Sequence, residues 1–233
     1  MKKFAFLLLL LFVALGLGTI FLYTDTFLLE EIDIESGWIP KEEILQYATL
    51  HKGQNLFFLN RIDIIKKIRQ DQRVDEVEFK KVYPAKLLLR VKPKIPFIKV
   101  IHGKQILLLD QKKNLIAIDF DYKDLTTIKD FAVQEFNLGK PLLFKDEELI
   151  HNALDLAELC QQAELTNIVI WQENGLIYLY LGEGFKASFG KGGDIEKKFN
   201  NFYTIYLDLL EKNINSGTIN LTNPQAPTFL PFD

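Results

Sequence analysis

VDEVEFKKVYPAKLLLRV, residues 74–91, is the stretch that decides the fold of the N-terminal part of this chain. Val77 and Phe79 alternate with charged residues, and the same alternation of apolar and polar residues resumes after a Tyr-Pro-Ala turn. Such alternation is typical of half-buried strands, because successive side chains of a strand point to opposite faces. The stretch therefore predicts two strands, over 74–82 and 86–91, joined by a short turn.

The residues upstream of this stretch predict one further strand and two helices. Polar and apolar residues alternate over 30–35, which predicts a strand. Pro40 begins a helix, and Asn60 caps a second one, in which Ile65 is expected to face the sheet and Lys66 the solvent. The order is β-α-α-β-β, which favours a small α+β domain with both helices on one side of a three-stranded sheet.

The N-terminus, MKKFAFLLLLLFVALGLGTIFLY, contains twenty consecutive residues without charge or proline, from Phe4 to Tyr23. A helix of that length is about 30 Å long and matches the hydrocarbon core of a bilayer. We predict a cytoplasmic tail over 1–3 and a transmembrane helix over 4–23. Because two lysines precede the apolar run and acidic residues follow it, the positive-inside rule predicts that the bulk of the chain lies outside the cytoplasm.

A cleaved signal peptide is the alternative for this segment, since Ala14-x-Gly16 is typical of a small-residue cleavage site. Apolar residues continue from Leu17 to Tyr23 beyond that site, and the run exceeds the about 7–15 apolar residues usual in a signal peptide. The sequence therefore favours an uncleaved anchor.

The residue pattern changes after Pro96, so we expect one domain over 28–96, a second over 97–222 and a tail over 223–233 whose prolines prevent regular structure. In the second domain, one helix is predicted from Asp146 to Gln161, and a second begins at Asp194, which is expected to cap it. Strands are predicted over 105–109, 114–119, 167–171, 176–181, 185–189 and 218–221. The second domain is therefore expected to be mixed and β-rich, with two helices.

Composition and motifs exclude several kinds of function. A net charge of −3, a pI near 5.7 and the lack of a lysine-arginine cluster argue against nucleic-acid binding. The single cysteine, Cys160, lies on the apolar side of a predicted helix and is expected to be buried. His51, His102 and His151 have no metal-ligand spacing, and the glycines at 190–193 lack the spacing of a phosphate-binding loop. We therefore assign no catalytic, cofactor-binding or metal-binding residue.

The β-α-α-β-β segment resembles a POTRA domain, and the whole chain resembles the bacterial cell-division family FtsQ/DivIB. The landmarks of the first domain are Ile32-Asp33-Ile34-Glu35, Gly37, Pro40, Ile44, Gly53, Asn55-Leu56-Phe57, Val74, Val77, Phe79, Tyr83-Pro84, Leu87, Leu89, Val91 and Pro96. The landmarks of the second domain are Leu108-Leu109-Asp110, Leu115, the 185–190 strand and turn with Lys197 in the next helix, and Ile219-Asn220-Leu221. Their ordered combination carries the resemblance.

The resemblance implies a non-enzymatic scaffold of the divisome, held by a single membrane pass in the bacterial cytoplasmic membrane and enriched at the division septum. Such proteins bind small single-pass coiled-coil division proteins outside the cytoplasm and help to control septal peptidoglycan synthesis, without a cofactor. The alternatives are a membrane-anchored envelope enzyme and a POTRA-containing outer-membrane assembly factor. The latter would need several POTRA copies and a β-barrel, for which too few residues follow Pro96.

The last predicted strand, Thr218-Ile219-Asn220-Leu221, is the candidate partner-binding site, with Phe229 as a neighbouring anchor. An edge strand exposes unpaired N–H and C=O groups, to which a partner strand can add. The alternative is that this strand merely closes the sheet, with the tail covering it and Phe229 packing onto its own domain. Given the resemblance, we favour the interaction site.

Overall fold

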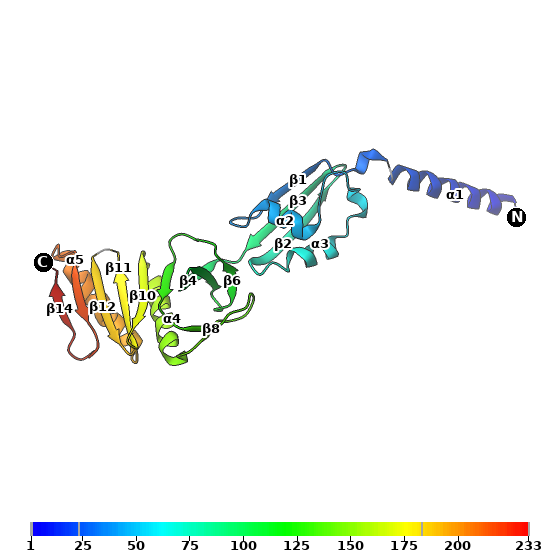
Figure 1. Ribbon diagram of the computed structural model, residues 1–233. Helices are drawn as coiled ribbons and strands as arrows, with labels where there is room; N and C mark the ends of the chain where they lie inside the picture. Colours follow the sequence, from blue (N-terminus) through cyan, green and yellow to red (C-terminus); the bar gives the residue numbers. More distant parts are fainter. Residues whose placement is uncertain (1, 23, 183, 233) are drawn as a thin grey trace. The chain divides into compact units, whose positions relative to one another are not determined.

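The computed structural model describes residues 2–22, 24–182 and 184–232, which divide into two compact units, Met1–Lys94 and Ile95–Asp233 (Figure 1). The first unit begins with helix α1 (Lys2–Leu22), so the apolar run is helical as predicted. Within the described ranges, no helix meets both the length and the apolarity required of a membrane span. Met1 of the predicted tail and Tyr23 at the end of the predicted membrane helix lie outside the described residues.

The remainder of the first unit confirms the β-α-α-β-β order. Its elements are η1 (Asp25–Phe27), β1 (Glu31–Glu35), α2 (Lys41–Ala48), η2 (Leu56–Phe58), α3 (Arg61–Ile68), β2 (Val74–Val82) and β3 (Lys86–Pro93). Among the described residues the sheet has three strands in the order β1-β3-β2, with β3 parallel to β1 and antiparallel to β2. Both helices pack on the same sheet face, because Ile44 of α2 and Ile68 of α3 share one core with Val77, Phe79 and Leu89.

Helix α3 is rotated slightly from the predicted orientation. Ile64 and Ile68 are its buried residues, whereas Ile65 is only partly buried and Lys66 is exposed as expected. Ile62, two residues after the N-cap Asn60, is exposed to solvent. The face of the helix that contacts the sheet is therefore centred on Ile64 and Ile68, which are four residues apart and so lie on one side of the helix.

Replacing Ile68 by alanine is expected to lower the free energy of unfolding by about 2–5 kcal/mol, because it leaves a cavity under the sheet. Ile68 is 0% exposed, whereas Ile62, the matched control, is 79% exposed. Ile62→Ala is expected to change stability by no more than about 0.5 kcal/mol. Urea denaturation followed through Trp38 fluorescence in a Trp171→Phe background measures both variants. Equal losses would show that the contact face of α3 is assigned wrongly.

Arg73 links the start of β2 to helix α2. Its guanidinium donates to both carboxylate oxygens of the buried Asp71, at 2.6–3.1 Å, and to the Glu43 carboxylate of α2. The same guanidinium lies 6.0 Å from the centre of the Trp38 ring. Hydrogen bonds to Asp71 above all, and then to Glu43, raise the pKa of Arg73 above its usual range despite partial burial. The network is therefore a charged connection between helix α2 and the residues that precede β2.

The second unit is built on a large mixed sheet. Over the described residues the sheet has nine strands in the order β14-β13-β12-β11-β10-β7-β4-β5-β6, and β8 and β9 form a separate pair. The strands are β4 (Pro96–His102), β5 (Gln105–Asp110), β6 (Leu115–Ile118), β7 (Thr126–Lys129), β8 (Val133–Glu135), β9 (Leu143–Phe144), β10 (Ile168–Glu173), β11 (Leu176–Leu181), β12 (Phe185–Gly190), β13 (Gly217–Asn220) and β14 (Thr228–Pro231). Helices α4 (Glu147–Gln162) and α5 (Ile195–Glu211) pack against it, and their apolar side chains join one core with those of the strands.

The two helix starts in the second unit differ from each other. Helix α4 begins where the sequence predicted it, and Asp146 caps it, since its Oδ1 accepts a hydrogen bond from the Leu149 N–H at 2.9 Å. Asp194 is the N-cap residue of α5 as predicted, but it adopts a left-handed conformation with φ 48° and its side chain makes no cap hydrogen bond. The side chain of an N-cap residue usually reaches the first turn from an extended backbone, so the left-handed conformation accounts for the missing bond.

Candidate partner-binding site

Strand β13 does not form the open edge that the sequence predicted. It pairs in parallel with β12 on one side and antiparallel with β14 on the other. Figure 1 shows β14 in red outside β13, at the end of the sheet. The expectation that Thr218–Leu221 lies at the edge is therefore wrong, and so is the expectation that the proline-rich tail lacks regular structure. Asp233, the last residue of that tail, lies outside the described residues.

The backbone hydrogen bonds show which groups of β13 face which neighbour. The N–H of Gly217 donates to the Gly184 carbonyl at 3.0 Å, and the N–H of Leu221 donates to the Ser188 carbonyl at 2.8 Å. Because backbone groups alternate in direction along a strand, Ile219 also faces β12. Thr218 and Asn220 consequently direct their N–H and C=O groups at β14. The four predicted residues thus split into two that hold the strand in the sheet and two that could hold a partner.

The outer edge of β14 is poor in hydrogen-bond donors. Thr218 pairs with Leu230 and Asn220 pairs with Thr228, so Leu230 and Thr228 direct their backbone groups inward at β13. Positions 227, 229 and 231 then face outward, and they are occupied by Pro227, Phe229 and Pro231. Proline has no N–H, so within this described stretch only Phe229 offers a donor to an incoming strand. Prolines of this kind are typical of edges that resist further pairing.

The Phe229 side chain packs back onto its own unit, where it is partly buried against the main core. Gly217 makes this possible, since a Cβ atom at that position would overlap the Phe229 ring. The loop before β14 is also held, because the Asn201 side chain donates to the Pro224 carbonyl at 2.8 Å. By contrast, the Leu230 side chain is exposed. In this conformation Phe229 therefore anchors β14 rather than a partner.

A buried lysine supports this end of the sheet. The motif residue suggested by the sequence, Lys197, is exposed, while its neighbour Lys198 is buried in α5. The Lys198 ammonium donates to the carbonyl of Phe189 at 2.8 Å and to that of Gly192, and burial lowers the pKa of Lys198. The glycine turn therefore presents carbonyl groups to a cation instead of N–H groups to a phosphate. The burial of Lys198 could have been predicted from the sequence, because position 198 falls on the apolar stripe of its helix.

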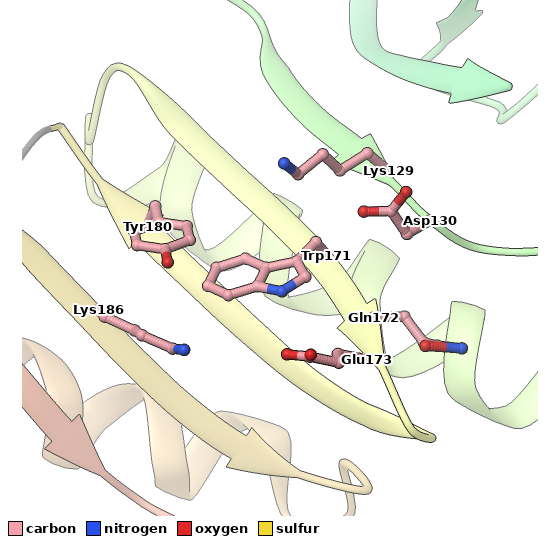
Figure 2. Close-up of a pocket in the computed structure, with 7 residues that line it drawn as sticks. All are labelled: Lys129, Asp130, Trp171, Gln172, Glu173, Tyr180 and Lys186. Atoms are coloured by element: carbon pink, nitrogen blue, oxygen red, sulfur yellow. The ribbon is translucent and has the colours of Figure 1, made fainter. Parts of the chain in front are cut away.

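A cluster of aromatic side chains lies on the sheet face beside this site. Figure 2 shows Trp171 in the middle, Tyr180 next to it, and Lys129 and Lys186 on opposite sides. The Trp171 ring stacks on Tyr180 at 4.0 Å and on Tyr178 at 5.0 Å between ring centres, and the Lys186 ammonium lies 4.7–5.9 Å from the three rings. The faces of these rings thus contact one another and a cation. They stabilise β10 and β11 in the middle of the sheet and leave little aromatic face for a ligand.

Among the described residues there is no group of three or more His, Cys, Asp or Glu side chains placed to hold a metal ion. Cys160 is buried as predicted, and burial raises the pKa of its thiol to about 12. A thiol in that state is protonated and unreactive at neutral pH. The chemistry available at the end of the sheet is backbone pairing and apolar packing.

Comparison with known proteins finds a domain model for the first unit and relatives for most of the chain. The model of the POTRA domain, FtsQ-type, matches residues 36–92, which include α2, α3, β2 and all of β3 but its last residue. A protein named cell division protein DivIB from Clostridium botulinum strain Hall is 27% identical over 226 residues, which cover 91% of this chain and 85% of that protein. The protein of the same name from C. botulinum strain Loch Maree is 26% identical over 219 residues, and the one from Clostridium tetani is 20% identical over 192 residues. The tetani alignment covers 79% of this chain and 71% of that protein.

Proposed function

Because this chain belongs to the FtsQ/DivIB family of bacterial cell-division proteins, we propose that it is a non-enzymatic scaffold of the divisome. In this role it binds small single-pass division proteins outside the cytoplasm and helps to control septal peptidoglycan synthesis. The observation that carries the proposal is the short terminal strand β14, which covers a better pairing edge on β13. The proposed site is the side of β13 on which Thr218 and Asn220 present their backbone groups; Ile219 and Leu221 hold the strand on β12, and Phe229 leaves the site together with β14.

We infer that a partner strand takes the place of β14 on β13. Thr218 and Asn220 supply two donors and two acceptors to that side, whereas the outer edge of β14 supplies one donor. A partner strand would replace the backbone hydrogen bonds that β14 makes to Thr218 and Asn220, each of which contributes about 0.5–1.5 kcal/mol, so the exchange of strands costs no hydrogen bond at β13. An apolar partner side chain could occupy the place of Phe229 over Gly217 and supply specificity.

The experiment for the scaffold role is capture from detergent-solubilised membranes of dividing cells, with the full chain as bait. Recovery of small single-pass division proteins supports the proposal, and hydrolysis of peptidoglycan or ester substrates by the same preparation would support the envelope-enzyme alternative instead. The scaffold role requires binding without turnover. Recovery of outer-membrane assembly proteins alone would contradict it.

We also infer that the segment over 4–23 attaches the chain to the cytoplasmic membrane, with enrichment at the septum. What supports this is the uncharged run of twenty residues and the lysines before it. A reporter enzyme that is active only outside the cytoplasm, fused after Asp233, is expected to be active. The mature protein is expected to retain its first residue. A mature N-terminus at Leu17 would show that the segment is a cleaved signal peptide.

A further inference from the structure

Four aromatic side chains gather at one end of the first unit. This aromatic cluster consists of Phe27, Phe57, Phe58 and Tyr83, whose rings contact one another with centres 5.7–6.4 Å apart. Phe57 is 43% exposed, Phe58 50% and Tyr83 52%. A contiguous apolar patch of this kind on a protein surface marks an interaction site. The functions considered so far make no use of it.

Hydrogen bonds fix the cluster to the chain that leaves α1. The N–H of Leu29 donates to the Gln54 carbonyl at 2.8 Å, and the N–H of Gly53 donates to the Leu29 carbonyl at 2.9 Å. The loop continues directly into η2, where the Phe57 N–H donates to the Asn55 side chain at 2.9 Å and the Lys81 ammonium donates to the Phe57 carbonyl at 2.9 Å. The loop that carries Phe57 and Phe58 is thus tied to the segment that follows the apolar helix.

The covalent link between α1 and the cluster is short. Phe27 follows Leu22, the last residue of α1, by five positions in the sequence, and a fully extended chain over those five steps spans at most about 17 Å. The η1 turn over Asp25–Phe27 shortens the link further. The polar layer on each side of a bilayer's hydrocarbon core is itself about 5–8 Å thick. A membrane-inserted α1 therefore keeps Phe27 within about 17 Å of the hydrocarbon core, which is close enough for the cluster to reach the lipid headgroups.

We propose that the aromatic cluster docks into the headgroup region of the bilayer, on the outer surface of the membrane that holds α1. Tyrosine favours this layer because its ring is apolar and its hydroxyl is hydrated, and phenylalanine side chains can insert at the boundary between headgroups and acyl chains. The proposal rests on the membrane attachment proposed above. Docking adds a second contact between the first unit and the membrane, and so restricts the rotation of that unit about the link after α1.

The test uses the full chain in lipid vesicles, with a nitroxide spin label attached to one introduced cysteine in a Cys160→Ala background. The labelled variants are Phe58→Cys in the cluster, Leu10→Cys in α1 and Asp75→Cys at the far end of β2. Asp75 is the matched control, because eight residues of strand place it about 27 Å from Tyr83. Collision rates of each label with oxygen, which is enriched in lipid, and with a water-soluble nickel chelate report its depth.

The ratio of oxygen to nickel collisions is expected to be several-fold higher for the label at position 58 than for the label at 75, and highest at position 10. A label at position 10 in lipid, together with a label at position 58 as hydrated as the one at position 75, would leave the membrane attachment of α1 intact. It would overturn the docking of the aromatic cluster into the headgroups, and the cluster would then be a contact surface for a protein. If the label at 10 is itself hydrated, the attachment fails and docking falls with it.

Discussion

A chain that ends after Thr222 is expected to capture its division partners more strongly than the full chain. It lacks β14, so the backbone groups of Thr218 and Asn220 are open, and a partner no longer has to displace a resident strand. A chain that ends after Asn215 lacks β13 as well and is expected to lose capture altogether. Pull-down from solubilised membranes measures both, with circular dichroism to verify that each shortened chain is folded.

Proline substitutions in the chain that ends after Thr222 separate pairing from folding. Thr218→Pro and Asn220→Pro remove donors that face the partner and are expected to abolish capture with the fold retained. Ile219→Pro is the matched control, because it removes a donor that faces β12 and is expected to disturb the sheet itself. If the chain without β14 instead loses capture while folded, the partner binds β14 and the displacement mechanism is wrong.

Arg73→Leu is expected to lower the free energy of unfolding of the first unit by about 3–5 kcal/mol, because it leaves the buried Asp71 carboxylate without its cation. The Arg73 side chain is 14% exposed, and it connects Asp71 with Glu43 of α2. Urea denaturation followed through Trp38 fluorescence in the Trp171→Phe background gives the value. Adding Asp71→Asn to Arg73→Leu is expected to restore part of the loss, because it removes the unpaired charge.

Arg90→Leu is the matched control for Arg73→Leu. Arg90 also contacts two carboxylates, those of Glu35 at 3.0 Å and Glu78 at 3.8 Å, but its side chain is 64% exposed. Surface ion pairs of this kind contribute about 0–1 kcal/mol, so a small loss is expected. Equal losses for Arg73→Leu and Arg90→Leu would mean that the buried network does not stabilise the first unit beyond an ordinary surface pair.

Local patterns in the sequence were sufficient to predict most helices and strands of the first unit. Alternation over 74–91 predicted β2 and β3, and the side chain of Asn60 caps α3 as expected, accepting from Ile62 and Asp63. In the second unit, Asn174-Gly175 forms the turn between β10 and β11, and both residues have the positive φ that a tight hairpin requires. In each case the determining interactions lie within a few residues of one another in the sequence.

The features that sequence reasoning missed depend on pairing between distant segments. β7 was not predicted, because its four residues are stabilised by parallel pairing with β4 and β10 rather than by their own pattern. β14 was not predicted because prolines argue against a strand. Pro227, just before β14, and Pro231 at its end both lie at positions that need no hydrogen bond to β13. Because β14 was not predicted, β13 was expected to be the edge strand of the sheet. The candidate residues were thus close together in space, but their environment differed from the prediction.

A reversible covalent lock between β13 and β14 tests the central claim most directly. Thr218 and Leu230 are direct partners across the two strands, and the about 5.5 Å between the Cα atoms of such a pair suits a disulfide. The chain with Thr218→Cys and Leu230→Cys is expected to lose partner capture when oxidised and to regain it on reduction, because the locked β14 cannot leave β13. Capture by the oxidised chain equal to that by the reduced chain would contradict the displacement of β14 by a partner strand.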